Sequence, residues 1–124
     1  MPSLPDGDPA PTDGRLPASA ALGALGRRFG VYVHVPFCVR RCGYCDFNTY
    51  TPAELHSGAT TLADTYLQAV DREMELAARV LADLDAPRPV STVFLGGGTP
   101  TMLKPDQLTD LLARIRTTWG LIPD

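Results

Sequence analysis

One run of this chain predicts both a strand and a metal site: Val31-Tyr-Val-His-Val-Pro-Phe-Cys38-Val-Arg-Arg-Cys42-Gly-Tyr-Cys45. Its first half alternates valine with other residues, which predicts a strand over residues 31–35 that ends at Pro36. Its second half places three thiols in a CxxxCxxC pattern directly after that strand. Thiols this close together predict a metal site. An iron-sulfur cluster of four irons, held at three of them, keeps the fourth iron open to a reactive ligand.

Two other uses of these thiols stay open. The chain has three cysteines in all, so a disulfide framework would leave one thiol over, and we consider it the weakest of the readings. A structural zinc site is normally closed by four ligands, and His34 or His56 would have to be the fourth. Zinc ligands also tend to come as two pairs, whereas this sequence offers no second pair. The spacing therefore favours iron and sulfide over zinc.

The composition excludes several classes of function. A chain of 124 residues with a net charge of -3 lacks the basic face that phosphate contacts need, which argues against a nucleic-acid binder. No stretch reaches the roughly 18 to 20 apolar residues of a transmembrane helix. Residues 18–25 have no basic region ahead of them, so a signal peptide is not expected. Reduced thiols and an oxygen-sensitive cluster both fit the cytoplasm, where we expect the protein to act.

Alternating strands and helices predict an α/β fold. Residues 1–28 are rich in Pro, Gly and Ala and show no apolar periodicity, which predicts a disordered tail before a domain at residues 29–124. In that domain the order strand, helix, strand, helix is typical of parallel strands joined by crossovers. After the first strand, the expected elements are a loop at 37–58, a helix at 62–84, a strand at 90–95 and a helix at 105–119.

The last helix is predicted from an apolar stripe between Pro105, which suits the first turn, and Gly120, which suits the end. Lys104 is a poor residue for its cap. The stripe should pack on the strands, and its members are Leu108, Leu111, Leu112 and Ile115.

A second motif, Gly96-Gly97-Gly98-Thr99-Pro100, follows the strand predicted at residues 90–95. Consecutive glycines let the main chain approach a ligand without a Cβ in between. Ligands of parallel sheets bind at the carboxyl ends of the strands. The cysteine loop leaves its own strand at the same end, so the sequence predicts a glycine-lined ligand site beside the metal site.

The cysteine run and the later Val93-Phe-Leu-Gly-Gly-Gly-Thr-Pro100 together resemble the radical S-adenosylmethionine (radical SAM) proteins of the oxygen-independent coproporphyrinogen oxidase-like family. The likeness covers roughly residues 30–119. It implies that the chain is the strand-helix-strand-helix portion of a partial (βα)6 barrel. Members of the family are several times longer, so we expect an N-terminal fragment that has no activity alone.

The resemblance also implies the ligands. A 4Fe-4S cluster would be held by Cys38, Cys42 and Cys45, and its unique iron would bind S-adenosylmethionine. In that family an electron from the reduced cluster then breaks a sulfur-carbon bond of S-adenosylmethionine. The match of motif positions places the following residues at S-adenosylmethionine: Tyr32, the main chain of Tyr44, Gly96, Gly97, Gly98, Thr99 and Pro100.

Two branches of the family compete, so the sequence leaves open whether the whole protein is an enzyme. One decarboxylates coproporphyrinogen III; the other, called HemW, binds heme and passes it to acceptor proteins. The oxidase-type loop carries a further cysteine two places after the third, where this chain has Phe47. We therefore expect the heme-chaperone branch, with the oxidase and a zinc-stabilised interaction module as alternatives. Heme or porphyrin, a heme-acceptor protein and an electron donor are the implied partners, and heme would be bound mainly by the C-terminal part that family members have.

Overall fold

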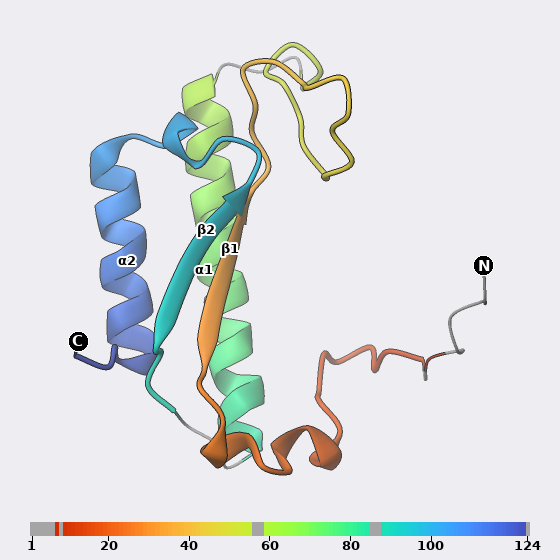
Figure 1. The fold of residues 1–124 in the computed structure, drawn as a ribbon, viewed down its shortest axis with the longest axis vertical. Coiled ribbons are helices and arrows are strands. Elements are labelled where there is room, and N and C mark those ends of the chain that lie inside the picture. The colour runs from red at the N-terminus through yellow and green to blue at the C-terminus, as the bar shows by residue number, and fades with distance from the viewer. Residues whose placement is uncertain (1–6, 8, 56–58, 85–87, 124) are drawn as a thin grey trace.

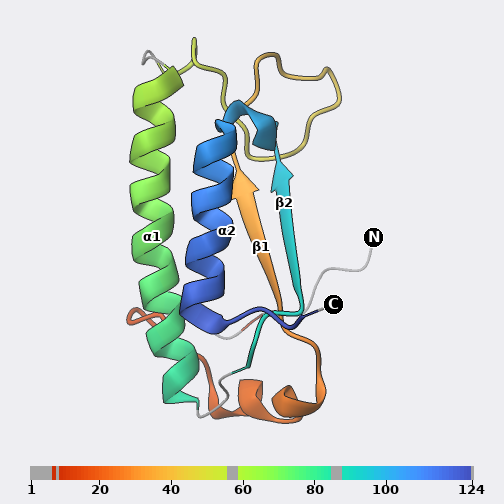
Figure 2. The same cartoon turned by 90° about the vertical axis from the view of Figure 1, so that its left-hand side faces the viewer.

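The computed structural model describes residues 7, 9–55, 59–84 and 88–123. Within this part of the chain two strands and two long helices follow one another in the order β1 (Gly30–Val35), α1 (Ala59–Asp83), β2 (Thr92–Gly97) and α2 (Pro105–Trp119). Both helices lie on one side of the strands, and the loop after β1 rises beyond the strands' ends (Figure 1, Figure 2). The predicted α/β alternation is confirmed.

Strands β1 and β2 are parallel, and their register runs from Gly30 opposite Thr92 to Val35 opposite Gly97. The second strand was predicted at residues 90–95, and this boundary is wrong by two residues at each end. Strand β2 takes in Gly96 and Gly97 because β1 continues to Val35 and offers them partners. Val90 forms a separate parallel bridge with Leu121.

Helix α2 has the predicted boundaries. Pro105 occupies its first position, and the main-chain N–H of Lys104 donates to Oε1 of Gln107 at 2.9 Å. Gly120 closes the helix with a φ of 76°, and its N–H donates to the Arg116 carbonyl at 2.8 Å. Helix α1 begins at Ala59, three residues earlier than predicted.

Two groups of buried side chains form the core between the sheet and the helices. One contains Val33, Val90, Leu111 and Ile115, and the other contains Val35, Phe37, Ala63 and Leu103. The predicted stripe of α2 is wrong at Leu112, which is 39% exposed. Each residue of a helix is turned about 100° from the one before, so Leu112 points away from the core that Leu111 enters.

Within the part of the chain that the structure describes, neither helix covers the other face of the sheet. Side chains of a strand alternate between its two faces, so Tyr32 and Phe94 point away from the helices that bury Val33. Tyr32 is 53% exposed and Phe94 is 66% exposed. Two aromatic rings thus stand on the uncovered face, side by side, because the register pairs these two residues.

The N-terminal segment has two short 3-10 turns, at Ala18–Ala21 and Ala24–Gly26, among its described residues. Ala24 is buried. The Arg88 guanidinium donates to the carbonyls of Ala24 and Arg27, and it lies over the Phe29 ring. These contacts of Arg88 connect the N-terminal segment to the end of the sheet where β1 begins. The division of the chain near residue 28 stays a prediction. None of the described helices combines the length and apolar character of a transmembrane span.

Candidate functional site

The cysteine loop (residues 37–50) is closed at its base by main-chain hydrogen bonds. The N–H of Tyr50 donates to the Pro36 carbonyl at 2.7 Å, and the N–H of Cys38 donates to the Tyr50 carbonyl at 3.0 Å. Inside the loop, the N–H of Cys45 donates to the Cys42 carbonyl at 3.0 Å. The loop therefore leaves and re-enters the fold at the carboxyl end of β1, as Figure 1 shows.

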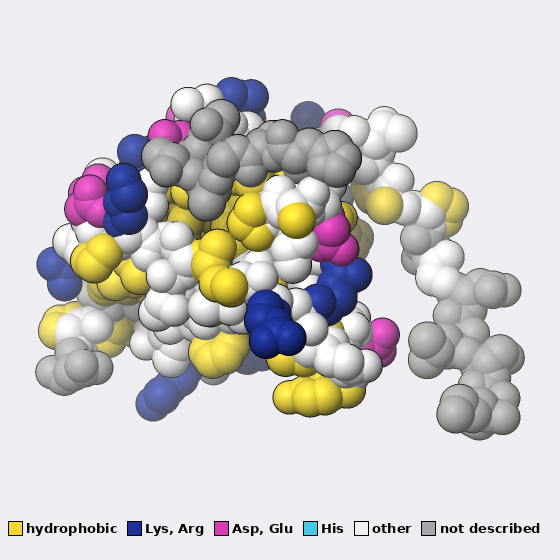
Figure 3. Space-filling view, turned by 90° about the horizontal axis from the view of Figure 1, so that it is seen from above, with side chains coloured by type: hydrophobic (Ala, Val, Ile, Leu, Met, Phe, Trp, Pro, Cys, Tyr) yellow, Lys and Arg dark blue, Asp and Glu magenta, His cyan; other side chains and the backbone are white. Residues whose placement is uncertain are grey.

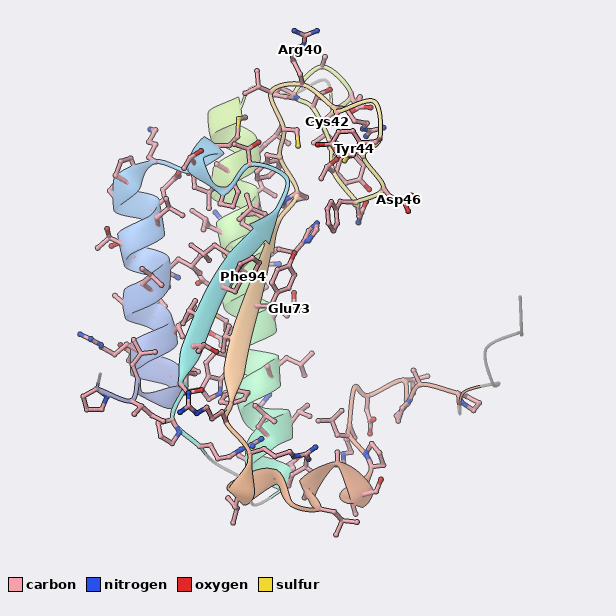
Figure 4. All side chains as sticks on the ribbon, in the orientation of Figure 1. Arg40, Cys42, Tyr44, Asp46, Glu73 and Phe94 are labelled. Carbon is pink, nitrogen blue, oxygen red and sulfur yellow. The ribbon has the colours of Figure 1, made fainter. Side chains whose placement is uncertain are left out.

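The three thiols differ in their surroundings. Cys38 is buried, Cys45 is half-buried and Cys42 is exposed, and all three are free. Figure 4 shows Cys42 and Tyr44 in the part of the loop that stands away from the helices. Among the described residues, no three His, Cys, Asp or Glu side chains are close enough to hold a metal ion. The structure thus brings the thiols to one loop without gathering their sulfurs.

Hydrogen bonds favour the thiolate form of Cys45. The Thr49 hydroxyl, 3.5 Å from the sulfur, and the main chain of Phe47 lower the pKa of this thiol, with a smaller contribution from the charge of Arg41. Arg41 is held in place by a hydrogen bond to the Thr49 carbonyl and an ion pair with Glu54 at 3.2 Å. A lowered pKa suits a metal ligand, because the thiolate is the form that binds metal.

Arg40 differs from Arg41 in its position. It stands at the outer tip of the loop and points away from the rest of the molecule (Figure 4). Seen from this end, the surface carries hydrophobic side chains between scattered Lys, Arg, Asp and Glu side chains (Figure 3). The surface at the end of the molecule that carries the thiols is therefore neither uniformly apolar nor of one charge.

The glycine run lies against the first thiol. A Cβ added to Gly98 would overlap the Phe37 carbonyl and lie 2.8 Å from the Cys38 sulfur. The N–H of Gly98 donates to the Val35 carbonyl at 2.8 Å, and that of Thr99 donates to the Phe37 carbonyl at 2.6 Å. Only a residue without a side chain fits so close to Cys38. The two motifs are therefore neighbours in the structure, which is the arrangement predicted from their places after parallel strands.

The aromatic pair covers the start of the glycine run. The rings of Tyr32 and Phe94 are stacked, with centroids 5.8 Å apart and an angle of 20° between their planes. A Cβ added to Gly96 would lie 2.7 Å from the Phe94 ring and 2.9 Å from the Tyr32 ring. Phe94 is not among the site residues predicted from the sequence. The signal that could have found it is its place opposite Tyr32, which requires the strand register.

Three predicted residues remain: Tyr44, Thr99 and Pro100. Tyr44 is 90% exposed in the cysteine loop. Thr99 is extended, and Pro100 begins the 3-10 turn Pro100–Met102 that leads to α2. The structure therefore brings Tyr32, Cys38 and the glycines together and leaves Tyr44 at the surface.

The donor set fits an iron-sulfur cluster. Three free thiols occupy one short loop, one of them has a lowered pKa, and a glycine lies against another. His34 does not complete a zinc site here, because its two ring nitrogens are engaged by Tyr32 and by the Asn48 carbonyl. His56, the other candidate, lies outside the described residues.

A family profile described as the Radical SAM superfamily matches residues 32–121. The chain belongs to the radical SAM superfamily. The matched region contains the cysteine loop, the glycine run and all four main elements except the first two residues of β1.

Radical SAM relatives of two kinds match the chain. It is 54% identical over 99 residues to the heme chaperone HemW of Mycobacterium tuberculosis (strain ATCC 25618 / H37Rv), covering 80% of this chain and 24% of that protein. It is 35% identical over 99 residues to the oxygen-independent coproporphyrinogen III oxidase of Pseudomonas aeruginosa, covering 80% of this chain and 20% of that protein.

A solved radical SAM structure shows the same fold. The structure is coproporphyrinogen III oxidase (HemN) from Escherichia coli, with a TM-score of 0.62 and 33% sequence identity over 83% of this chain and 22% of that chain. The chain therefore spans about a quarter or less of the length of these relatives.

Proposed function

We propose that this chain is the cluster-binding and S-adenosylmethionine-binding segment of a HemW-like radical SAM protein, and that the whole protein binds heme and transfers it. The observation that carries the proposal is the 54% identity to a heme chaperone across both motifs, together with the contact between Gly98 and Cys38. A heme-acceptor protein, an electron donor and a cytoplasmic location belong to the same proposal.

Each part of the site has a role in this proposal. Cys38, Cys42 and Cys45 would hold the 4Fe-4S cluster, which when bound would supply an electron for cleavage of a sulfur-carbon bond of S-adenosylmethionine. The run from Gly96 to Pro100 binds the methionine part through its main chain, and Tyr32 closes the site from the open face of the sheet. The main chain of Tyr44 contacts the adenine.

The choice between chaperone and oxidase rests on two observations. Identity to the heme chaperone is 54%, against 35% to the oxidase over the same number of residues. The chain also has Phe47, an exposed aromatic residue, where the oxidase-type loop has a further cysteine. The oxidase is the second candidate, because a solved structure with a similar fold is an oxidase.

Anaerobic reconstitution with iron and sulfide tests the cluster. The full-length protein that carries this segment should become brown and absorb broadly near about 400 nm, as thiolate-ligated clusters do. Replacing Cys38, Cys42 or Cys45 by alanine should abolish this absorption. Val39→Ala is the matched control, because Val39 is an exposed loop residue without a metal-binding group. A complete cluster in any single cysteine variant, or stoichiometric zinc without iron uptake, would refute the assignment.

A separate pair of measurements tests carrier against oxidase. In the same full-length protein, titration with hemin should give saturable binding, and coproporphyrinogen III should not be decarboxylated. Turnover of coproporphyrinogen III in the absence of hemin binding would instead support the second candidate.

A further inference from the structure

The imidazole of His34 contacts all three segments of the candidate site. Its Nδ1 lies 2.8 Å from the Tyr32 hydroxyl on β1, and its Nε2 lies 2.9 Å from the Asn48 carbonyl in the cysteine loop. A Cβ added to Gly97 would lie 2.8 Å from Nδ1 and Cε1 of the same ring. The ring therefore fills the space between the strand, the loop and the glycine run.

The two hydrogen bonds determine which ring nitrogen carries the proton. A main-chain carbonyl only accepts hydrogen bonds, so Nε2 of His34 must be the donor to Asn48. Nδ1 then accepts from the Tyr32 hydroxyl, which can donate. The main chain of His34 is itself held, because the Tyr66 hydroxyl donates to its carbonyl at 2.8 Å. A directed chain of hydrogen bonds thus runs from Tyr32 through His34 to the loop.

The carbonyl of Asn48 is the group through which the cysteine loop is bonded to His34. Asn48 lies three residues after Cys45 and directly before the buried Thr49, whose hydroxyl is 3.5 Å from the Cys45 sulfur. Beyond it, the loop is closed by the main-chain bonds of Tyr50. The bond from His34 therefore connects β1 to the stretch between the third thiol and the base of the loop.

We propose that His34 is a positioning residue that anchors residues 46–50 of the cysteine loop to β1 and against the glycine run. This inference rests on the proposed function in one respect, which is that the cysteine loop holds the cluster. The position requires a donor at one end and an acceptor at the other. The group at this position also packs directly on Gly97, where an added Cβ would lie 2.8 Å from the imidazole. Leucine supplies none of the hydrogen bonds, whereas glutamine supplies both a donor and an acceptor.

Hydrogen exchange in the full-length protein without cluster tests the anchor. In His34→Leu, the amides of residues 46–50 should exchange roughly five- to ten-fold faster, as expected from the loss of one or two hydrogen bonds. His34→Gln should restore much of the protection. Tyr66→Phe is the matched control, because it removes the bond to the His34 main chain and leaves the imidazole in place. Nitrogen NMR of the wild-type imidazole should show the proton on Nε2.

Three results would overturn the anchor. They are unchanged exchange of residues 46–50 in His34→Leu, an equal rise at the α2 core amides such as Leu111, and an Nε2 that carries no proton. Iron uptake by the wild-type protein is measured in parallel. If the wild type takes up no iron while the exchange results are as expected, the proposed function fails and the anchor stands.

Discussion

Replacing Gly98 by alanine should force the glycine run and the cysteine loop apart. The new Cβ would overlap the Phe37 carbonyl oxygen and lie 2.9 Å from its carbon, and both are main-chain atoms with no rotamer to change. The two segments are also joined by the hydrogen bond from Thr99 N–H to the same carbonyl, at 2.6 Å. The added methyl group can therefore be accommodated only by a shift of the main chain around Cys38.

Overpacking of this kind costs about 1–3 kcal/mol, so Gly98→Ala should lower the free energy of unfolding by that amount. Urea unfolding followed by circular dichroism measures it. Cys38, which is buried in the wild type, should also react several-fold faster with an alkylating reagent after the shift. The matched control is Gly43→Ala in the same loop, where an added Cβ meets nothing within 4 Å. An unchanged urea midpoint together with an unchanged Cys38 reaction rate in Gly98→Ala would show that the close approach is not real.

Three further predictions concern the core and the loop. Leu111→Ala should lower the free energy of unfolding by about 2–5 kcal/mol, and Leu112→Ala by less than about 1 kcal/mol, because only the former opens a cavity; equal losses in urea unfolding would contradict this. Burial, with the nearby charge of Glu73, raises the pKa of Tyr66 to about 12. The unfolded chain releases the Tyr66 proton near pH 10 and the folded protein near pH 12, so the free energy of unfolding should fall as the pH rises between those values. In Tyr66→Phe the fall in the free energy of unfolding between pH 10 and pH 12 should be smaller by the contribution of this group. Arg41→Ala removes an exposed ion pair worth roughly 0–1 kcal/mol, so it should leave the urea midpoint nearly unchanged. Amides at residues 45–50 should nevertheless exchange faster; a large drop in the midpoint, or unchanged exchange, would argue against this role.

Short-range patterns in the sequence were enough to predict the kind of fold and to indicate the two motifs proposed to form the site. The signals that carry this prediction are local, and each specifies the conformation of a few neighbouring residues. They are the alternation of valines at residues 31–35, the apolar repeat of the helices and the glycine at position 120. The order of these elements then implies parallel strands. The three thiols and three glycines are visible in the same way, because each motif lies within a few consecutive residues.

How these motifs meet depends on contacts between segments that are distant in the chain. Gly96 and Gly97 belong to β2 because β1 continues far enough to pair with them, and Phe94 stands beside Tyr32 for the same reason. Neither the end of β2 nor the pairing of Phe94 with Tyr32 can be predicted from neighbouring residues, since the register joins strands that are about 60 residues apart in the chain. The contacts of His34 with Asn48 and with Gly97 likewise depend on where a long loop returns. Periodicity describes one segment at a time, whereas a site is made by the distances between segments, and those distances are set by packing.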